Sequence, residues 1–342
     1  MTQTLTDRER QVLEAVIATY VATAEPAGSR TISKRFGMML SPASIRNIMS
    51  DLEEKGYLYH PHTSAGRIPT DQAYRLYVDE LMRATAVTPI EARQIHEELS
   101  ADRTALDALL TRAAQVLGVL TSELGVAGGP TLDDAVLDHL ELLRVSSDRL
   151  LLVLTLRRGA VRTIFVAVPS QMAADAILQV AVVLNERLAG LTLREIRQSI
   201  PARLRDAARE PAASELLDIF IQEADDLFEV GSAGDVVLGS TGPLSGQPEF
   251  ATKEGLKGLM HVTERRDVLR EALQRRQEPG LTITIGAEHG DPTLSPFTLV
   301  TSTYRVGPLS GVIGVMGPTR MPYQKIVAIV EHTSRLVGDL TR

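Results

Sequence analysis

The sequence predicts an α+β protein of two or three domains. Over roughly the first 125 residues, apolar side chains recur at helical spacing. Between residues 140 and 168 the pattern changes to three short apolar runs separated by turns, which is typical of strands. A length of 342 residues and a hydrophobic content of 44% are enough for more than one packed core.

Composition excludes several classes of protein. The chain has no cysteine, which rules out disulfides and thiolate chemistry and suits a reducing cytoplasm. The first ten residues are polar and charged rather than a signal peptide. No apolar run approaches the roughly 18–20 residues that a membrane helix needs. We therefore expect a cytoplasmic protein that has no membrane partner.

The first two helices are marked by their ends. Thr6 and Glu9 form a capping box, and the helix that follows has an apolar face made of Leu13, Val16, Ile17 and Tyr20. After a turn over residues 24–28, we expect Ser29 to cap a second helix that ends at Gly37, with Ile32 and Phe36 facing inward. Arg30, Lys34 and Arg35 remain outside it, where they would face either a phosphate backbone or only solvent.

The third helix presents side chains suited to reading bases. Ser41 is a good N-cap, Pro42 suits the first helical position, and Gly56 marks the end. A buried stripe is expected from Ile45, Ile48, Met49 and Leu52. The opposite side of its first turns carries Ala43, Ser44, Arg46 and Asn47. Arg and Asn are the side chains best shaped to contact guanine and adenine edges in a major groove.

A small β-ribbon is predicted after this helix. Residues 57–59 and 67–68 favour two short strands joined by residues 60–66. Three helices followed by such a ribbon are the arrangement of a winged helix-turn-helix, whose third helix enters the major groove. The alternative is an ordinary amphipathic helix followed by a hairpin. The candidate DNA-binding residues are Ser29, Arg30, Lys34, Ser41, Ser44, Arg46, Asn47, His62, Thr63, Ser64 and Arg67.

The distribution of charge qualifies this prediction. The whole chain carries a formal charge of −7, yet residues 1–85 contain ten Lys/Arg and ten Asp/Glu. The acidic excess therefore lies outside the candidate DNA-binding domain. A neutral domain can bind DNA through local basic groups, so we expect modest affinity for each copy and a need for pairing.

The rest of the chain alternates between helical and strand patterns. Thr70 should cap a helix with Tyr74, Tyr77, Val78 and Leu81 on one side, and residues 85–89 look like a hinge. A helical pattern follows from 89 to 125 and should end at residues 125–130. Further strands are expected at 140–145, 150–156, 161–168, 236–238, 281–285, 297–306 and 311–315. Further helices are expected at 177–188, in short pieces over 190–230 broken at Pro201 and Pro211, near 268–273, and from Pro322 to the end.

Three stretches of this sequence resemble the HrcA family of heat-inducible transcription repressors of bacterial chaperone operons. They are Glu25–Thr31, Ser44–Asp79, which includes the run from Pro61 to Thr70, and Ile313–Tyr323. The resemblance spans both ends of the chain, and the middle is less distinctive. Four positions depart from the family's usual residues, namely Ala27, Pro42, Gln72 and Ala73. None of these departures removes a base-reading group.

The resemblance implies a fold and a mode of action. It implies a winged helix with a linker helix over residues 1–85, then a GAF-like α/β domain over 86–342 with an inserted dimerisation segment at approximately 135–250. It also implies a homodimer bound to double-stranded operator DNA at an inverted repeat. Activity would be supported by the GroE chaperonin and lost on heating.

Three other classes remain as alternatives. An enzyme is disfavoured because the sequence contains no phosphate-binding Gly-rich loop, no nucleophile elbow and no zinc-protease helix. His60 and His62 are the only close pair of histidines and fall in the ribbon, so we expect no catalytic residue, no metal and no cofactor. A ligand-controlled transcription factor stays open, although no ring of convergent polar groups is visible. A pure oligomerisation module would make the Arg46 and Asn47 face coincidental.

Overall fold

A computed structural model describes most of the chain. The described ranges are 5–37, 40–62, 66–83, 85–100, 106–131, 135–157, 161–169, 172–205, 211–228, 236–274, 280–307 and 309–341. The chain forms two compact units. The first comprises residues 1–128, 236–304 and 312–342, and the second comprises residues 129–235 and 305–311.

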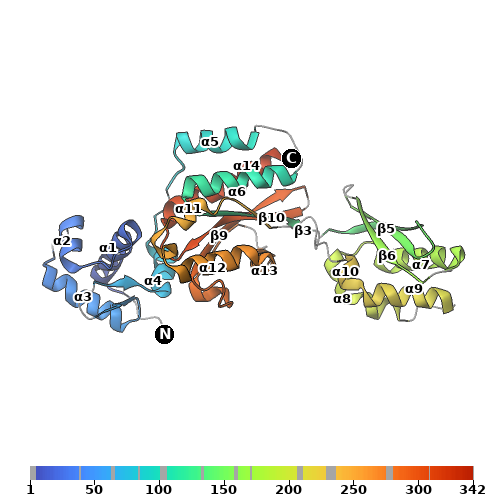
Figure 1. The fold of residues 1–342 in the computed structure, drawn as a ribbon, viewed down its shortest axis with the longest axis horizontal. Coiled ribbons are helices and arrows are strands. Elements are labelled where there is room, and N and C mark those ends of the chain that lie inside the picture. Colours follow the sequence, from blue (N-terminus) through green and yellow to red (C-terminus); the bar gives the residue numbers. More distant parts are fainter. Residues whose placement is uncertain are drawn as a thin grey trace. The chain divides into compact units, whose positions relative to one another are not determined.

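The first unit begins with three helices and a two-stranded ribbon, here called the head (residues 5–70; blue in Figure 1). The helices are α1 (Asp7–Thr23), α2 (Ser29–Phe36) and α3 (Pro42–Glu54). Strands β1 (Leu58–Tyr59) and β2 (Ile68–Pro69) pair antiparallel. The capping box of Thr6 and Glu9 is confirmed, as is the end of α3 before Gly56, whose φ is 82°. The buried core of the head includes Val12, Leu13, Val16, Ile17, Ile32, Ile45, Met49, Leu52 and Leu58.

A short helix leads from the head into the rest of the unit. Helix α4 (Asp71–Leu76) is capped by Thr70, as predicted, since the Thr70 side chain accepts a hydrogen bond from the Ala73 N–H. The last turn differs from the prediction because Tyr77–Leu81 is π-helical, a widening that is often found at functional sites. Two helices follow where one long pattern was expected, α5 (Pro89–Ser100) and α6 (Leu106–Thr121).

The part of the first unit that follows the head and its linker is here called the body, and a five-stranded sheet forms its centre. Its strand order is β7-β3-β10-β9-β8, and the strands are β3 (Leu124–Thr131), β7 (Val236–Leu238), β8 (Leu281–Ile285), β9 (Phe297–Val306) and β10 (Leu309–Pro318). Figure 1 shows α5, α6 and the final helix α14 (Tyr323–Leu340) on one side of this sheet. The other side carries α12 (Lys253–Glu264) and α13 (Arg266–Gln274), and the short helix α11 (Gly242–Ser245) follows strand β7.

An apolar core between the sheet and α12–α13 holds the body together. It includes Val126, Val262, Leu269, Leu299 and Met316, and the rings of Phe250 and Phe297 stack with their centroids 5.8 Å apart. The sequence analysis missed two elements here. Residues 125–130, expected only to end a helical pattern, form part of strand β3, and α12 was not predicted.

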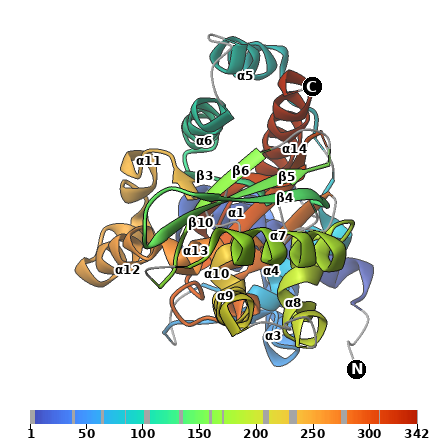
Figure 2. The same cartoon turned by 90° about the vertical axis from the view of Figure 1, so that its right-hand side faces the viewer.

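The second unit is a three-stranded antiparallel sheet covered by helices on one face (Figures 1 and 2). The strands are β4 (Leu137–Arg144), β5 (Arg149–Leu156) and β6 (Val161–Ala167), close to the predicted runs. The helices are α7 (Ala174–Leu188), α8 (Leu193–Leu204), α9 (Pro211–Gln222) and α10 (Ala224–Phe228). Pro201 lies inside α8 and does not break it, because Ile196, Ile200 and Leu204 continue one buried stripe past the proline. None of the helices within the described ranges is long and apolar enough to cross a membrane.

Candidate nucleic-acid interface

Helix α3 buries one side and exposes the side that carries the candidate base-reading groups. The Ser41 hydroxyl accepts a hydrogen bond of 3.1 Å from the Ser44 backbone N–H, and the two hydroxyls lie 3.0 Å apart. This confirms Ser41 as the N-cap. Arg46 and Asn47 are exposed, as are the side chains of Ser41 and Ser44. The first turns of α3 therefore present short polar groups, one Arg and one Asn to the outside.

Helix α2 ends at Gly37 as predicted, but its N-cap and the direction of Phe36 differ from the prediction. Its N-cap is Gly28, which has no side chain to cap the helix, and Ser29 is the first helical residue and half-buried. Phe36 was expected to face inward but is 39% exposed. The Arg35 guanidinium lies 5.9 Å from the centre of the Phe36 ring, a cation–π arrangement that explains how an exposed ring is accommodated. Arg30 and Lys34 are exposed, as expected.

The neutral head has a positive half. Residues 26–50, which run from the turn before α2 to the middle of α3, contain four Lys/Arg and no Asp or Glu. The acidic residues of α3 stand at its carboxyl end, at positions 51, 53 and 54. Because charges separated by more than about 10 Å are screened at physiological salt, this local excess matters more for an approaching anion than the net charge of the domain.

The ribbon is fastened to the turn before α2. Ala27 and Arg67 exchange two backbone hydrogen bonds of 2.9 Å, which form an isolated antiparallel bridge beside the ribbon. Gly66 makes this approach possible, because a Cβ at that position would lie 2.5 Å from the carbonyl oxygens of Pro26 and Ala27. The base of the ribbon is thus tied to the same segment that begins α2.

The Arg67 side chain is engaged within the head. Its Nη2 lies 2.7 Å from Glu53 Oε2 at the end of α3, and the side chain is 19% exposed. The other Glu53 oxygen contacts His60 Nδ1 on the ribbon. Glu53 therefore joins α3 to both arms of the ribbon. Sequence reasoning did not single out this residue, since nothing in the local pattern marks a carboxylate whose partners lie 7 and 14 positions away.

A second ion pair anchors the same end of α3 to α1. Lys55 Nζ lies 2.6 Å from Glu9 Oε1, and this hydrogen bond lowers the pKa of Glu9. The side chain that completes the N-terminal capping box thus also supports the carboxyl end of α3.

Of the remaining candidates, the structure describes only His62, which follows strand β1. His62 is exposed, whereas Thr63 and Ser64 lie outside the described residues. The structure therefore groups the candidates in two places. Ser29, Arg30 and Lys34 share the region of α2 and α3 with Ser41, Ser44, Arg46 and Asn47, and His62 and Arg67 belong to the ribbon.

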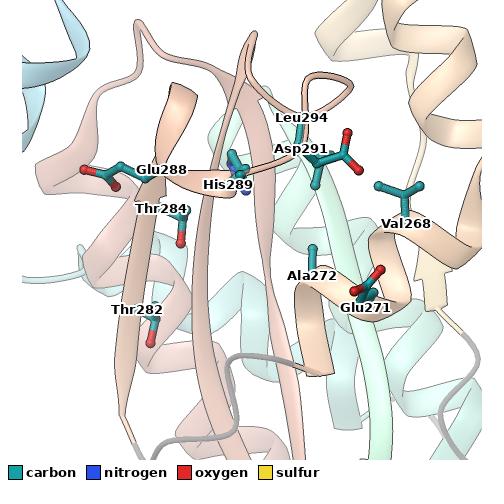
Figure 3. Close-up of a pocket in the computed structure, with 10 residues that line it drawn as sticks. Val268, Glu271, Ala272, Thr282, Thr284, Glu288, His289, Asp291 and Leu294 are labelled. Carbon is teal, nitrogen blue, oxygen red and sulfur yellow. The ribbon is translucent and has the colours of Figure 1, made fainter.

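A pocket lies apart from these residues, in the body (Figure 3). It has a volume of about 360 Å³ and lies between α13, strand β8 and the segment 288–294. Six polar side chains line it, namely Glu271, Thr282, Thr284, Glu288, His289 and Asp291. Sequence reasoning saw no such ring, because these residues lie up to 20 positions apart and converge only through the fold. Over the described ranges, no group of three or more metal-ligating side chains is placed to hold an ion.

Comparison with known proteins gives a consistent result. Residues 107–327 match the family model described as the HrcA protein C terminal domain. The chain is 38% identical over 340 residues to the heat-inducible transcription repressor HrcA of Chlorobium phaeobacteroides, covering 96% of both chains. It is 37% identical to the protein of the same name from Chlorobium phaeovibrioides, with 98% and 97% coverage.

A solved structure supports the fold alone. A crystal structure described as that of a hypothetical protein matches with a TM-score of 0.59 and covers 99% of both chains at 22% sequence identity.

Proposed function

The chain belongs to the HrcA family of heat-inducible transcription repressors, and from this premise we propose that it represses chaperone operons by binding operator DNA. Helix α3 inserts into the major groove, and the ribbon acts as a wing along the backbone. The names of the relatives favour this class over an enzyme. The observation that carries the proposal is the exposed, acid-free surface formed by α2 and the first turns of α3.

We assign the contacts by the chemistry of each side chain. Arg46 and Asn47 read base edges, because their donor and acceptor geometry fits guanine and adenine, and Ser44 adds a short contact beside them. Ser29, Arg30, Lys34 and Ser41 hold phosphates on either side. The wing contributes His62, Thr63, Ser64 and Arg67, which contact phosphate or the minor groove, where sequence information is thin.

We propose that residues 1–85 are the DNA-binding domain with its linker helix and that 86–342 form the GAF-like domain. The dimerisation segment interrupts that domain. The compact second unit, residues 129–235, supports a separate segment there and favours an end nearer 235 than 250.

A second copy of this chain is the proposed partner of the second unit. One face of its sheet packs on α7–α10, while the other exposes Leu143, Val145, Val161 and Phe165 by 48%, 55%, 62% and 64%. Leu143 pairs with Leu151, and Leu151 with Phe165, so one apolar row crosses all three strands. Contiguous exposed apolar surface of this kind marks interaction sites. A face-to-face dimer would cover it and bring two heads to an inverted repeat.

Heat inactivation and support by the GroE chaperonin follow from slow refolding. The central sheet pairs strands far apart in sequence, such as Val126 with Leu238, and such pairing is slow and exposes unpaired edges. Dilution from denaturant should recover more DNA-binding activity when chaperonin and ATP are present. Equal recovery without them would refute this part of the proposal.

A ligand-controlled repressor is the second candidate function, favoured by the polar pocket of the body (Figure 3). Native mass spectrometry of the purified chain would reveal a small molecule that copurifies with it. If protein purified under denaturing conditions and then refolded melts at the same temperature as natively purified protein, the result would count against a bound ligand.

A gel shift tests the central proposal. The probe is each chaperone promoter of the source organism, with a scrambled inverted repeat as the control and with the chaperonin present or absent. We expect a shifted band only with the intact repeat. Equal binding to the scrambled probe would contradict the proposal.

A further inference from the structure

Two arginines that belong to neither group of candidate DNA contacts tie the head to the body. Arg320 follows strand β10, and Arg75 lies on α4, which continues directly from the wing. Each guanidinium contacts more than one element, and each pairs with a carboxylate of the body.

Arg320 holds the carboxyl end of α1. Its Nη1 donates a 2.7 Å hydrogen bond to the Val21 carbonyl, in the last turn of that helix. The same guanidinium is fixed on the body by two hydrogen bonds to Glu249, of 2.6 and 3.0 Å, and the side chain is 13% exposed. Helix α1 has no basic residue in its own last turn. The body therefore supplies the cation that favours the negative end of a helix dipole.

Arg75 holds helix α4, which follows the head, on a different part of the body. Its Nε and Nη2 donate to the two oxygens of Glu288, at 2.8 and 2.6 Å, and Nη2 also donates to the Ile283 carbonyl at 2.7 Å. Such a two-pronged pair fixes direction as well as distance.

A third polar contact lies beside this pair. Asp71, the first residue of α4, accepts a 3.1 Å hydrogen bond from the Ala287 backbone N–H. Gly286 has φ = 54°, and a Cβ there would collide with the Asp71 carboxylate. The segment 286–288 is thus shaped to receive α4.

An apolar contact lies between the polar ones. The rings of Tyr74 on α4 and Tyr323 on α14 lie 5.8 Å apart, and each side chain is 1% exposed. A single contact would leave the head free to pivot about it. Contacts at the end of α1, the start of α4 and the middle of α4 restrict rotation about every axis, so the body sets the direction in which α3 points.

We propose that Arg75 and Arg320 determine which spacing between operator half-sites the repressor accepts. The inference rests on the proposed function, a dimer bound to an inverted repeat. When two heads are fixed on a dimer, half-site spacing must match the protein. A head released from its body would still read its half-site but would reach several spacings. Arg75 and Arg320 would thus act as positioning residues that set specificity without touching DNA.

The test compares the full-length chain with the double variant Arg75→Ala/Arg320→Ala. Fluorescence anisotropy would measure binding to the operator, to repeats lengthened or shortened by about five base pairs, which is half a helical turn, and to an isolated half-site. We expect the unmodified chain to prefer its own spacing by at least about tenfold. In the variant that ratio should fall towards one, while half-site affinity stays within about twofold.

A matched control removes two ion pairs that lie within the body. In Arg265→Ala/Lys325→Ala the pairs with Asp267 and Glu91 are lost, and the spacing preference should persist. Arg75→Lys/Arg320→Lys keeps the charge but loses the planar fork, so it should relax the preference without unfolding the head. If either double variant of Arg75 and Arg320, to alanine or to lysine, folds and keeps the full spacing preference, the inference is overturned. Failure of the unmodified chain to bind any inverted repeat would instead overturn the proposed function.

Discussion

Glu53 at the end of α3 and Arg67 at the base of the ribbon form an ion pair of 2.7 Å that joins helix α3 to the ribbon. The backbone of Arg67 also pairs with Ala27, in the turn that begins α2. One residue of the ribbon thus contacts both the turn before α2 and the last turn of α3. The arrangement makes the ribbon part of the packed head rather than a loose hairpin.

Removal of the Glu53 carboxylate should destabilise the head. Glu53→Gln leaves the Arg67 guanidinium, 19% exposed, without its charged partner, and we expect a loss of about 1–2 kcal/mol, between the values for exposed and buried pairs. Denaturant unfolding followed by circular dichroism measures it, with exposed Glu54→Gln as the control. Equal unfolding midpoints for the two variants would contradict the structural role.

Arg46 and Arg67 should have separable effects on DNA binding. Arg46→Ala should reduce the preference for operator over random DNA by about 1–3 kcal/mol, because a base contact is lost. Arg67→Ala should weaken binding to both DNAs, because the ribbon loses its ion pair with Glu53 as well as a phosphate contact. The lost phosphate contact should lower the salt slope by roughly one. Anisotropy titrations of both variants at two salt concentrations decide the matter. Retained specificity in Arg46→Ala, with lost specificity in Arg67→Ala, would reverse the assignment.

The local features of this fold were predictable because they depend on neighbours in sequence. The caps at Thr6, Ser41 and Thr70 are set by hydrogen bonds to backbone N–H groups three residues on, and sequence shows both partners. Strand β3 was not predictable, since its glycine-rich run is extended only through pairing with β7 and β10. Pro201 misled for the same reason, because tertiary burial outweighs the local cost of a proline.

The candidate interface divides in the same way. The exposed side of α3 follows from helical periodicity, so Arg46 and Asn47 could be named from the sequence. The environment of Arg67 could not, because Glu53 reaches it only after the ribbon folds back on α3. The contacts of Arg75 with Glu288 and of Arg320 with Val21 join residues more than 200 positions apart, and no local pattern indicates them.

Glu123 should make the stability of the body depend on pH. Burial raises the pKa of this carboxyl to about 8, from 4.5 in the unfolded chain. Between these values the folded protein holds a proton that the unfolded chain has lost. Stability should therefore fall as pH rises through this window, by up to about 1.4 kcal/mol per pH unit.

The variant Glu123→Gln isolates this effect. Its uncharged amide can still accept the 3.0 Å hydrogen bond from Gln247, so melting temperatures measured from pH 6 to pH 8.5 should decline less than those of the unmodified protein. Exposed Glu264→Gln serves as the control. Parallel curves for Glu123→Gln and the unmodified chain would show that Glu123 is not the group responsible.

The apolar face of the second unit should be the dimer interface. Phe165→Ser places a hydroxyl at the β6 end of the exposed apolar row and should shift the protein towards monomers in sedimentation velocity runs. Leu178→Ser is a matched control, since Leu178 on α7 is 63% exposed, almost the same as Phe165. A dimer that survives Phe165→Ser but dissociates in Leu178→Ser would place the interface on α7 instead.

Hydroxyl-radical footprinting of the full-length protein on its own chaperone promoters tests most directly whether the chain is a dimeric operator-binding repressor. We expect two protected half-sites related by an inverted repeat, with centres an integral number of helical turns apart, and loss of both in Arg46→Ala. Protection of one isolated half-site at full affinity, or protection that ignores sequence, would contradict the central claim.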